Sequence, residues 1–182
     1  MTKPPKPGIV IIGAGGHAKV LCDAIIAGDE YHVAGFTDAN VPVNTVIHHD
    51  YRVIAHQAHL QELTNRAEYF IVAIGNNSAR EELYNKAVQF FKPVSIIHPN
   101  AIVAASAEIK PGAVCLAGAI VNTNTVISEN TIINSGAVVD HDCVIGKNVH
   151  ISIGTMVGSN STIADGYTTA IGARIESFSK IS

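Results

Sequence analysis

A six-residue repeat runs through the second half of the chain and constrains the fold more than any other feature. Counting in steps of six from Ile97 to Ile181 gives fifteen positions, and thirteen of them hold Ile or Val. The abundance of these two residues would fill only roughly three or four of the positions by chance. The residue four places after each step is mostly small, as at Ala113 and Ala137. Residues 95–182 therefore form a true internal repeat.

This pattern predicts a left-handed parallel β-helix. Each hexad makes one face of a triangular prism, three hexads (about 18 residues) complete a coil, and fifteen hexads supply about five coils. A β-sandwich would instead need alternation with period two and hairpin turns, which this half of the chain does not show. The phase of the repeat directs Cys115 and Cys143 inward, so we expect both thiols to be core residues rather than reactive groups.

The first half alternates apolar runs with helical patterns, which predicts an α/β, Rossmann-like domain over residues 1–94 with a parallel sheet. Buried strands are expected at 9–12, 33–37 and 70–74, and helices near 18–27 and 78–91. Ser78 is the expected cap of the second helix. Residues 40–60, with four histidines, are expected to be a surface connection, and metal binding there is a weaker alternative; the histidines are His48, His49, His56 and His59.

The segment GAGGHA at 13–18 follows the first expected strand and opens the first helix, and Asp38 ends the second strand. Glycines permit close backbone approach, a helix N-terminus favours phosphate, and an acid can bond a ribose hydroxyl. A tight turn that binds nothing is the alternative. Because only about 95 residues precede the repeat, half of a full NAD-binding fold is missing. A nucleotide or nucleotide sugar therefore fits better than NAD.

The stretch VVDHDCVIG carries the polar residues of greatest interest. Asp140, His141 and Asp142 follow inward-facing Val139, so they are expected to point outward. An imidazole between carboxylates has raised basicity and suits a general base, whereas a solvated turn is the simpler interpretation. His150 lies nine residues further on, half a circuit away, so the two imidazoles can cooperate only across an interface between chains. Two histidines are too few for a trihistidine site, and no catalytic metal is expected.

Charge and cysteine content exclude several classes of protein. The net charge is −3 and there is no run of Lys or Arg, which disfavours binding to nucleic acid or to an anionic membrane. Three cysteines without close pairing fit a reducing compartment. The first apolar run is too short for a signal peptide or a membrane span, so we expect a cytoplasmic protein.

Taken together, the segments IVIIGAGGHAKV, IGNNSARE, IIHPNAIV, VVDHDCVIG and VHISIG resemble the bacterial acetyl-CoA-dependent sugar acetyltransferases of the left-handed β-helix type. That group acetylates UDP-4-amino sugars, GDP-perosamine or sialic acid. The resemblance implies transfer of an acetyl group from acetyl-CoA to the amine of a nucleotide-linked amino sugar by a homotrimer. O-acetylation of sialic acid and a non-catalytic, ligand-binding prism are the alternatives.

The resemblance also assigns roles to individual residues. It makes His141 the general base and Asp142 the acid that raises its basicity, and it places His150 and Ile171 against acetyl-CoA. The nucleotide-sugar contacts that it implies are Gly15, Gly16, His17, Asp38, Ala39, Gly75 and Ser78. Members of the group usually continue into further coils and a short cap, so the resemblance implies a β-helix domain that is short at its C-terminal end.

Overall fold

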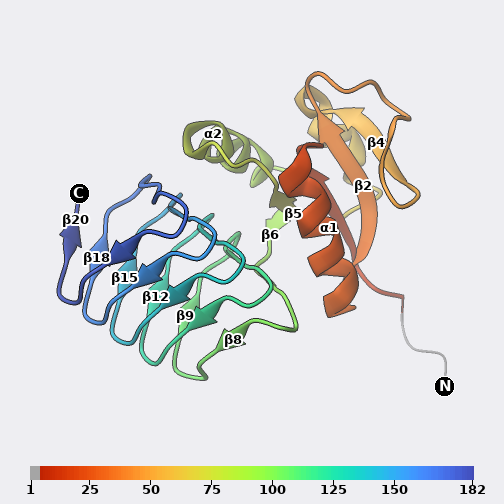
Figure 1. Ribbon diagram of the computed structural model, residues 1–182. Helices are drawn as coiled ribbons and strands as arrows, with labels where there is room; N and C mark the ends of the chain where they lie inside the picture. The colour runs from red at the N-terminus through yellow and green to blue at the C-terminus, as the bar shows by residue number, and fades with distance from the viewer. Residues whose placement is uncertain (1–4) are drawn as a thin grey trace.

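The computed structural model describes residues 5–182, which fold into an α/β unit followed by a stack of parallel coils (Figure 1). The α/β unit has a six-stranded sheet with the order β3-β4-β2-β1-β5-β6. Its elements are β1 (Gly8–Ile12), α1 (Gly16–Gly28), β2 (His32–Asp38), β3 (Val46–His48), β4 (Tyr51–His56), the 3-10 helix η1 (Gln57–Leu63), β5 (Tyr69–Val72), α2 (Asn77–Ala87) and β6 (Lys92–Pro93). The α/β prediction is confirmed.

The segment 40–60 differs from its prediction as a surface connection. Its β4 strand pairs in parallel with β2, and β3 pairs antiparallel with β4 at the edge of the sheet. Val53 is fully buried and Ala55 is nearly so, while Ile54 between them is less buried. The strand was missed because a single short run with two buried side chains carries little periodicity.

The second helix also begins differently from its prediction. Its N-cap is Asn76, whose side-chain oxygen accepts a hydrogen bond from the Ala79 amide at 2.9 Å, so the expected cap at Ser78 is wrong. The helix ends at Ala87, and a turn then buries Phe91 against the sheet. Ser78 instead lies exposed in the first turn.

The second half forms the predicted prism, in which every strand pair is parallel and residues eighteen apart in the sequence are neighbours, as Val114 and Ile132 are. Three sheets make its three faces. The first face holds β7 (Ile96–Ile97), β10 (Val114–Cys115), β13 (Ile132–Ile133) and β16 (His150–Ile151). The second face holds β8 (Ile102–Val103), β11 (Ile120–Val121), β14 (Val138–Val139), β17 (Met156–Val157) and β19 (Arg174–Ile175). The third face holds β9 (Glu108–Ile109), β12 (Val126–Ile127), β15 (Val144–Ile145), β18 (Thr162–Ile163) and β20 (Lys180–Ile181).

The interior of the prism is filled as the repeat predicts. The central hexad residues, from Val121 to Ile163, are at most 2% exposed, and together with the small residues they form one apolar cluster. Cys115 and Cys143 are fully buried, which confirms their inward phase. Only the end coils, which have no further coil to cover them, leave hexad residues partly open, as at Ile97.

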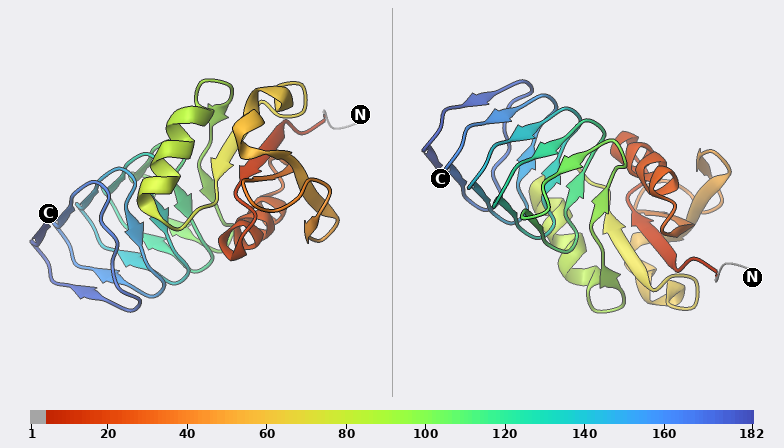
Figure 2. Two further views of the ribbon diagram at one scale, coloured as in Figure 1. Left: turned by 90° about the horizontal axis from the view of Figure 1, so that it is seen from above. Right: turned by 90° about the horizontal axis from the view of Figure 1, so that it is seen from below.

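The α/β unit packs on the first face of the prism. Val114 and Leu116 share one buried cluster with Leu21 and Ile25 of α1. Helix α2 lies along the flank of the coils (Figure 2). The first face is therefore occupied by the same chain's α/β unit. No helix within residues 5–182 is long and apolar enough to cross a membrane.

Candidate active site

His141 and Asp142 form an exposed pair at one corner of the prism. His141 Nδ1 lies 2.7 Å from Asp142 Oδ2. Since a carboxylate only accepts hydrogen bonds, Nδ1 carries the proton in the neutral ring and Nε2 keeps the lone pair. The hydrogen bond to Asp142 raises the pKa of His141 above its ordinary value, and the charge of Asp140 adds to this. The pair therefore has the tautomer and the basicity of a general base.

The backbone explains why an acid stands next to the histidine. From Gly112 to Phe178, each corner of the prism has a residue with positive φ, a conformation that favours Gly, Asn or Asp. Asp142 fills this place with φ 57°, in line with Asn124 (φ 59°) one coil earlier and Asn160 (φ 57°) one coil later. The left-handed turn thus accepts Asp142 at a position where the neighbouring coils have Asn.

The preceding coil holds both carboxylates. The amide of Asn122 donates to Asp140 at 2.9 Å, and the amide of Asn124 donates to Asp142 at 3.2 Å. Hydrogen bonds from His141 and then Asn124 keep the pKa of Asp142 below its ordinary value, and the bond from Asn122 does the same for Asp140. Both acids are therefore ionised at neutral pH and flank the imidazole with negative charge.

His141 lies on the far side of the prism from its own α/β unit. Its corner joins the second face (after β14) to the third face (before β15), whereas the α/β unit covers the first face. His150, by contrast, is in β16 on the first face. The two histidines of one chain are thus on opposite sides of the prism, as the nine-residue spacing predicts.

His150 is brought together with residues of the α/β unit. Its Nε2 lies 2.9 Å from the side-chain amide nitrogen (Nδ2) of Asn134 in the prism. Its ring also forms a hydrogen bond with the main chain of Gly75 in the α/β unit. Burial lowers the pKa of His150, and the nearby charge of Arg80 lowers it further. Burial, with smaller contributions from His150 and Arg80, lowers the pKa of His17 to about 4. Both rings are therefore neutral near pH 7.

His17 Nε2 is buried and has no hydrogen-bond partner among the described residues. A buried polar atom without a partner is costly unless a ligand or water satisfies it. Three predicted site residues from two parts of the sequence, His17, Gly75 and His150, thus lie together at the junction between α/β unit and prism.

Arg80 fixes this junction, and the sequence analysis missed it. It is the largest fully buried side chain, 1% exposed, and burial lowers its pKa to about 10, which leaves it charged. Its guanidinium donates to main-chain carbonyls of both parts of the molecule: Ile74 and Gly75 (both 3.1 Å), Asn130 (2.9 Å), Asn148 (2.7 Å) and Val149 (3.2 Å). The spacing of Arg80, Leu83 and Ala87 in the sequence indicates that Arg80 is buried, because these three residues lie on the same face of α2.

The glycine-rich turn leaves open space at the start of α1. Gly15 and Gly16 are exposed, and a Cβ at either would meet nothing within 4 Å. Asp38 shapes the wall of this region: one oxygen accepts from the Ala14 amide at 3.0 Å, and the other accepts from Asn40 at 2.8 Å and Val41 at 3.1 Å. The carboxylate thus holds two loops together, and the ribose contact expected from the sequence stays a prediction.

The remaining predicted residues lie around these sites. The Ala39 carbonyl is 3.0 Å from His56 Nε2. Ile171 is 77% exposed and lies at the corner that follows the first face. The main-chain amide of Gly172, the next residue, donates a hydrogen bond to the carbonyl of Ile153 one coil earlier. No hydrogen bond or apolar cluster within residues 5–182 joins the Ile171 side chain to His150.

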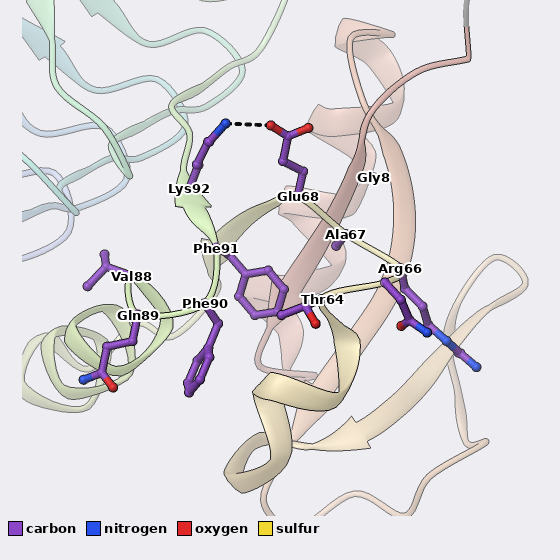
Figure 3. Close-up of a pocket in the computed structure, with 11 residues that line it drawn as sticks. Gly8, Thr64, Arg66, Ala67, Glu68, Val88, Gln89, Phe90, Phe91 and Lys92 are labelled. Atoms are coloured by element: carbon purple, nitrogen blue, oxygen red, sulfur yellow. Dashed lines mark hydrogen bonds and ion pairs between the residues drawn. The ribbon is translucent and has the colours of Figure 1, made fainter.

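A large hollow lies elsewhere, on the α/β unit. It has a volume of about 670 Å³ and is open, with Phe90, Phe91 and Arg66 among its lining residues (Figure 3). A Glu68–Lys92 ion pair of 2.8 Å lies at its rim. It is at the amino ends of β1, β5 and β6, whereas ligands of such sheets bind at the carboxyl ends of the strands. It is therefore not the substrate site.

A hexad prism with an exposed His–Asp pair, joined to a small α/β unit, defines a left-handed β-helix transferase. The PglD N-terminal domain family matches residues 8–87. A His-to-Asn variant of perosamine N-acetyltransferase from Caulobacter crescentus, solved with CoA and GDP-perosamine, is 34% identical, with a TM-score of 0.77 over 95% of this chain and 84% of that one. The chain belongs to this family of sugar N-acetyltransferases, as its sequence motifs predict.

Two further solved structures agree with this assignment. The acetyltransferase domain of PglB from Neisseria gonorrhoeae, in complex with acetyl coenzyme A, is 31% identical, with a TM-score of 0.70 over 96% of this chain and 87% of that one. WeeI from Acinetobacter baumannii is 18% identical, with a TM-score of 0.62 over 96% and 91% of the two chains, and it supports the fold alone. The comparison with curated protein sequences gave no match.

Proposed function

We propose that this enzyme transfers the acetyl group of acetyl-CoA to the amine of a nucleotide-linked amino sugar, with His141 as general base. The observation that carries the proposal is the His141–Asp142 pair, 2.7 Å apart and exposed on a prism edge. The amine attacks the thioester carbonyl, Nε2 of His141 takes the amine's proton and then passes it to the departing thiolate, and coenzyme A leaves as the thiol. Main-chain amides of the prism stabilise the oxyanion.

The substrates are assigned to the two parts of the chain. Residues 1–94 bind the nucleotide sugar, with Gly15, Gly16 and His17 near the phosphates. Residues 95–182 bind acetyl-CoA, with contacts at His150 and Ile171. The solved complexes of relatives with CoA, acetyl coenzyme A and GDP-perosamine support this assignment. We propose direct transfer, without an acyl-enzyme. Cys143, the thiol next to the His141–Asp142 pair, is a poor nucleophile because it is fully buried and burial raises its pKa.

The active site, in this proposal, lies between two chains of a homotrimer. The His141 corner is opposite the first face, so His141 cannot reach a sugar held by its own α/β unit. Apolar side chains left exposed on the second face and its adjoining corner favour contact with another chain. They are Ile102 (64% exposed), Ile153 (50%), Met156 (49%) and Ile171 (77%). We place the reaction in the cytoplasm, where three unpaired thiols fit.

The experiment is an acetyl-CoA consumption assay with UDP-, GDP- and dTDP-linked amino sugars and with free sialic acid, in which mass spectrometry identifies the product. We expect N-acetylation of at least one nucleotide-linked sugar. His141→Ala should lower turnover roughly 10²–10⁴-fold, as loss of a general base does, while both substrates still bind. O-acetylation of sialic acid alone, or near-normal turnover by the variant, would contradict the proposal.

A further inference from the structure

A cluster of two histidines and an aspartate lies on the α/β unit, away from the proposed active site. Asp23 is on α1, His48 ends β3, and His49 begins the turn into β4. His48 Nε2 is 2.7 Å and His49 Nε2 is 3.0 Å from the same oxygen, Asp23 Oδ1. Two separate elements thus direct three side chains to one point.

The backbone brings the two imidazoles to the same side. Consecutive residues of a strand point to opposite faces, so neighbouring histidines would ordinarily diverge. His49 has φ 49°, in the left-handed region, and its ring centroid lies 4.2 Å from that of His48. The strand ends at His48, and the left-handed residue that follows turns the second ring toward the same carboxylate.

The chemistry of the cluster is that of a transition-metal site. Two imidazole nitrogens and a carboxylate oxygen are ligands that Zn²⁺ binds, and three protein ligands leave a fourth position for water. A tetrahedral zinc ion holds its ligand atoms about 3.3 Å apart, as follows from bonds of about 2.0 Å. The three atoms already lie within 4.8 Å of one another, so rotation of the exposed Asp23 and His49 and the half-buried His48 side chains suffices.

We propose that Asp23, His48 and His49 bind one divalent transition-metal ion, with Zn²⁺ as the ion to test, and that the ion joins α1 to the β3–β4 hairpin. Within this hairpin β3 forms the edge of the sheet, and among the described strands this three-residue strand pairs with β4 alone. The proposed role is structural, and it does not rest on the proposed acetyl transfer, because the cluster shares no residue with those assigned to that reaction.

The test is titration calorimetry of Zn²⁺ into the chelator-treated full chain, with thermal unfolding as a second readout. We expect one saturable site per chain and a higher unfolding temperature with zinc. His49→Asn is the informative variant, since Asn tolerates the left-handed backbone but removes the imidazole. It should weaken binding at least about tenfold, the lower range for disturbing a metal site.

Asp23→Asn tests the same site from α1 without touching the turn, and it should weaken binding to a similar extent. His59→Asn is the matched control, because His59 is an exposed histidine that pairs with Glu62 outside the cluster. It should bind zinc like the unaltered chain. Absence of saturable binding, or equal affinity of the His49 and His59 variants, would overturn the proposal.

Discussion

At the scale of the residue, Asp142 combines two roles that the sequence does not separate. Its φ of 57° makes it a corner residue of the prism, and its carboxylate bonds to His141 Nδ1. Asn at this position would keep the corner, as Asn124 and Asn160 show in neighbouring coils. The electrostatic role can therefore be tested without disturbing the turn.

We predict that Asp142→Asn moves the acidic limb of the pH–rate profile to lower pH. A general base works only when it is unprotonated, so activity falls as the pH drops through the pKa of His141. Asp142 raises that pKa, and its removal lets it fall toward its ordinary value. The measurement is kcat/KM between about pH 5 and 9, with Glu176→Gln as a control at an exposed acid. An unchanged limb would show that Asp142 only shapes the corner.

At the scale of the element, α2 is the part that joins the two halves of the molecule. Arg80 donates to carbonyls on both sides of the junction, and Asn77 donates to the Gly166 carbonyl at 2.7 Å. These bonds hold the Gly75 loop beside His150. In the proposed function the nucleotide sugar and acetyl-CoA come together at this place. Arg80 is therefore a positioning residue in this account.

We expect Arg80→Met to destabilise the fold by about 2–4 kcal/mol, because it leaves several buried carbonyls without donors. Urea unfolding measures this loss. Lys86→Met is the control, since Lys86 lies on the same helix and makes only long contacts of 3.4 Å. The positioning role further predicts that Arg80→Lys raises KM more than it lowers kcat. If Arg80→Met were as stable as the Lys86 variant, the junction would not depend on Arg80.

The start of α2 offers a second comparison. Asn76→Ala should cost about 1 kcal/mol, because it removes the cap of the Ala79 amide, whereas Ser78→Ala should change stability by less than about 0.5 kcal/mol. Both values come from denaturant midpoints of the two variants. A larger loss at Ser78 than at Asn76 would mean that the helix begins two residues later in solution.

The prism was predictable from sequence to the level of single side chains, and the α/β unit less so. One rule, a branched residue every six, fixes the inward direction of the hexad residues from Val103 to Ile175, because each coil repeats the last. Strands β3 and β4 follow no repeat: the place of β4 is decided by pairing with β2, and that of β3 by pairing with β4. The helical stripe indicates that Arg80 is buried, but its long-range partners, the carbonyls of Asn130 and Asn148, lie fifty or more residues away, and no local pattern reveals them.

At the scale of the whole molecule, the fold separates the proposed base from the proposed substrate site. His141 lies at the corner opposite the first face, while His17, Gly75 and His150 lie where that face meets the α/β unit. A single chain thus contains all the residues predicted for the active site, but it holds His141 apart from the others. An oligomer in which the α/β unit of one chain faces the His141 corner of another resolves this separation.

Hybrid oligomers of two inactive variants test directly whether each active site lies between two chains. His141→Ala removes the base, and Gly15→Glu places a negative charge in the open space where phosphate is expected. Co-expression with two different tags and sequential purification yields oligomers that contain both variants. If each site is built from two chains, one of three sites in a hybrid trimer is intact, and about a third of the normal activity returns. If each site is built within one chain, the hybrids stay as inactive as the separate variants, and the account is wrong.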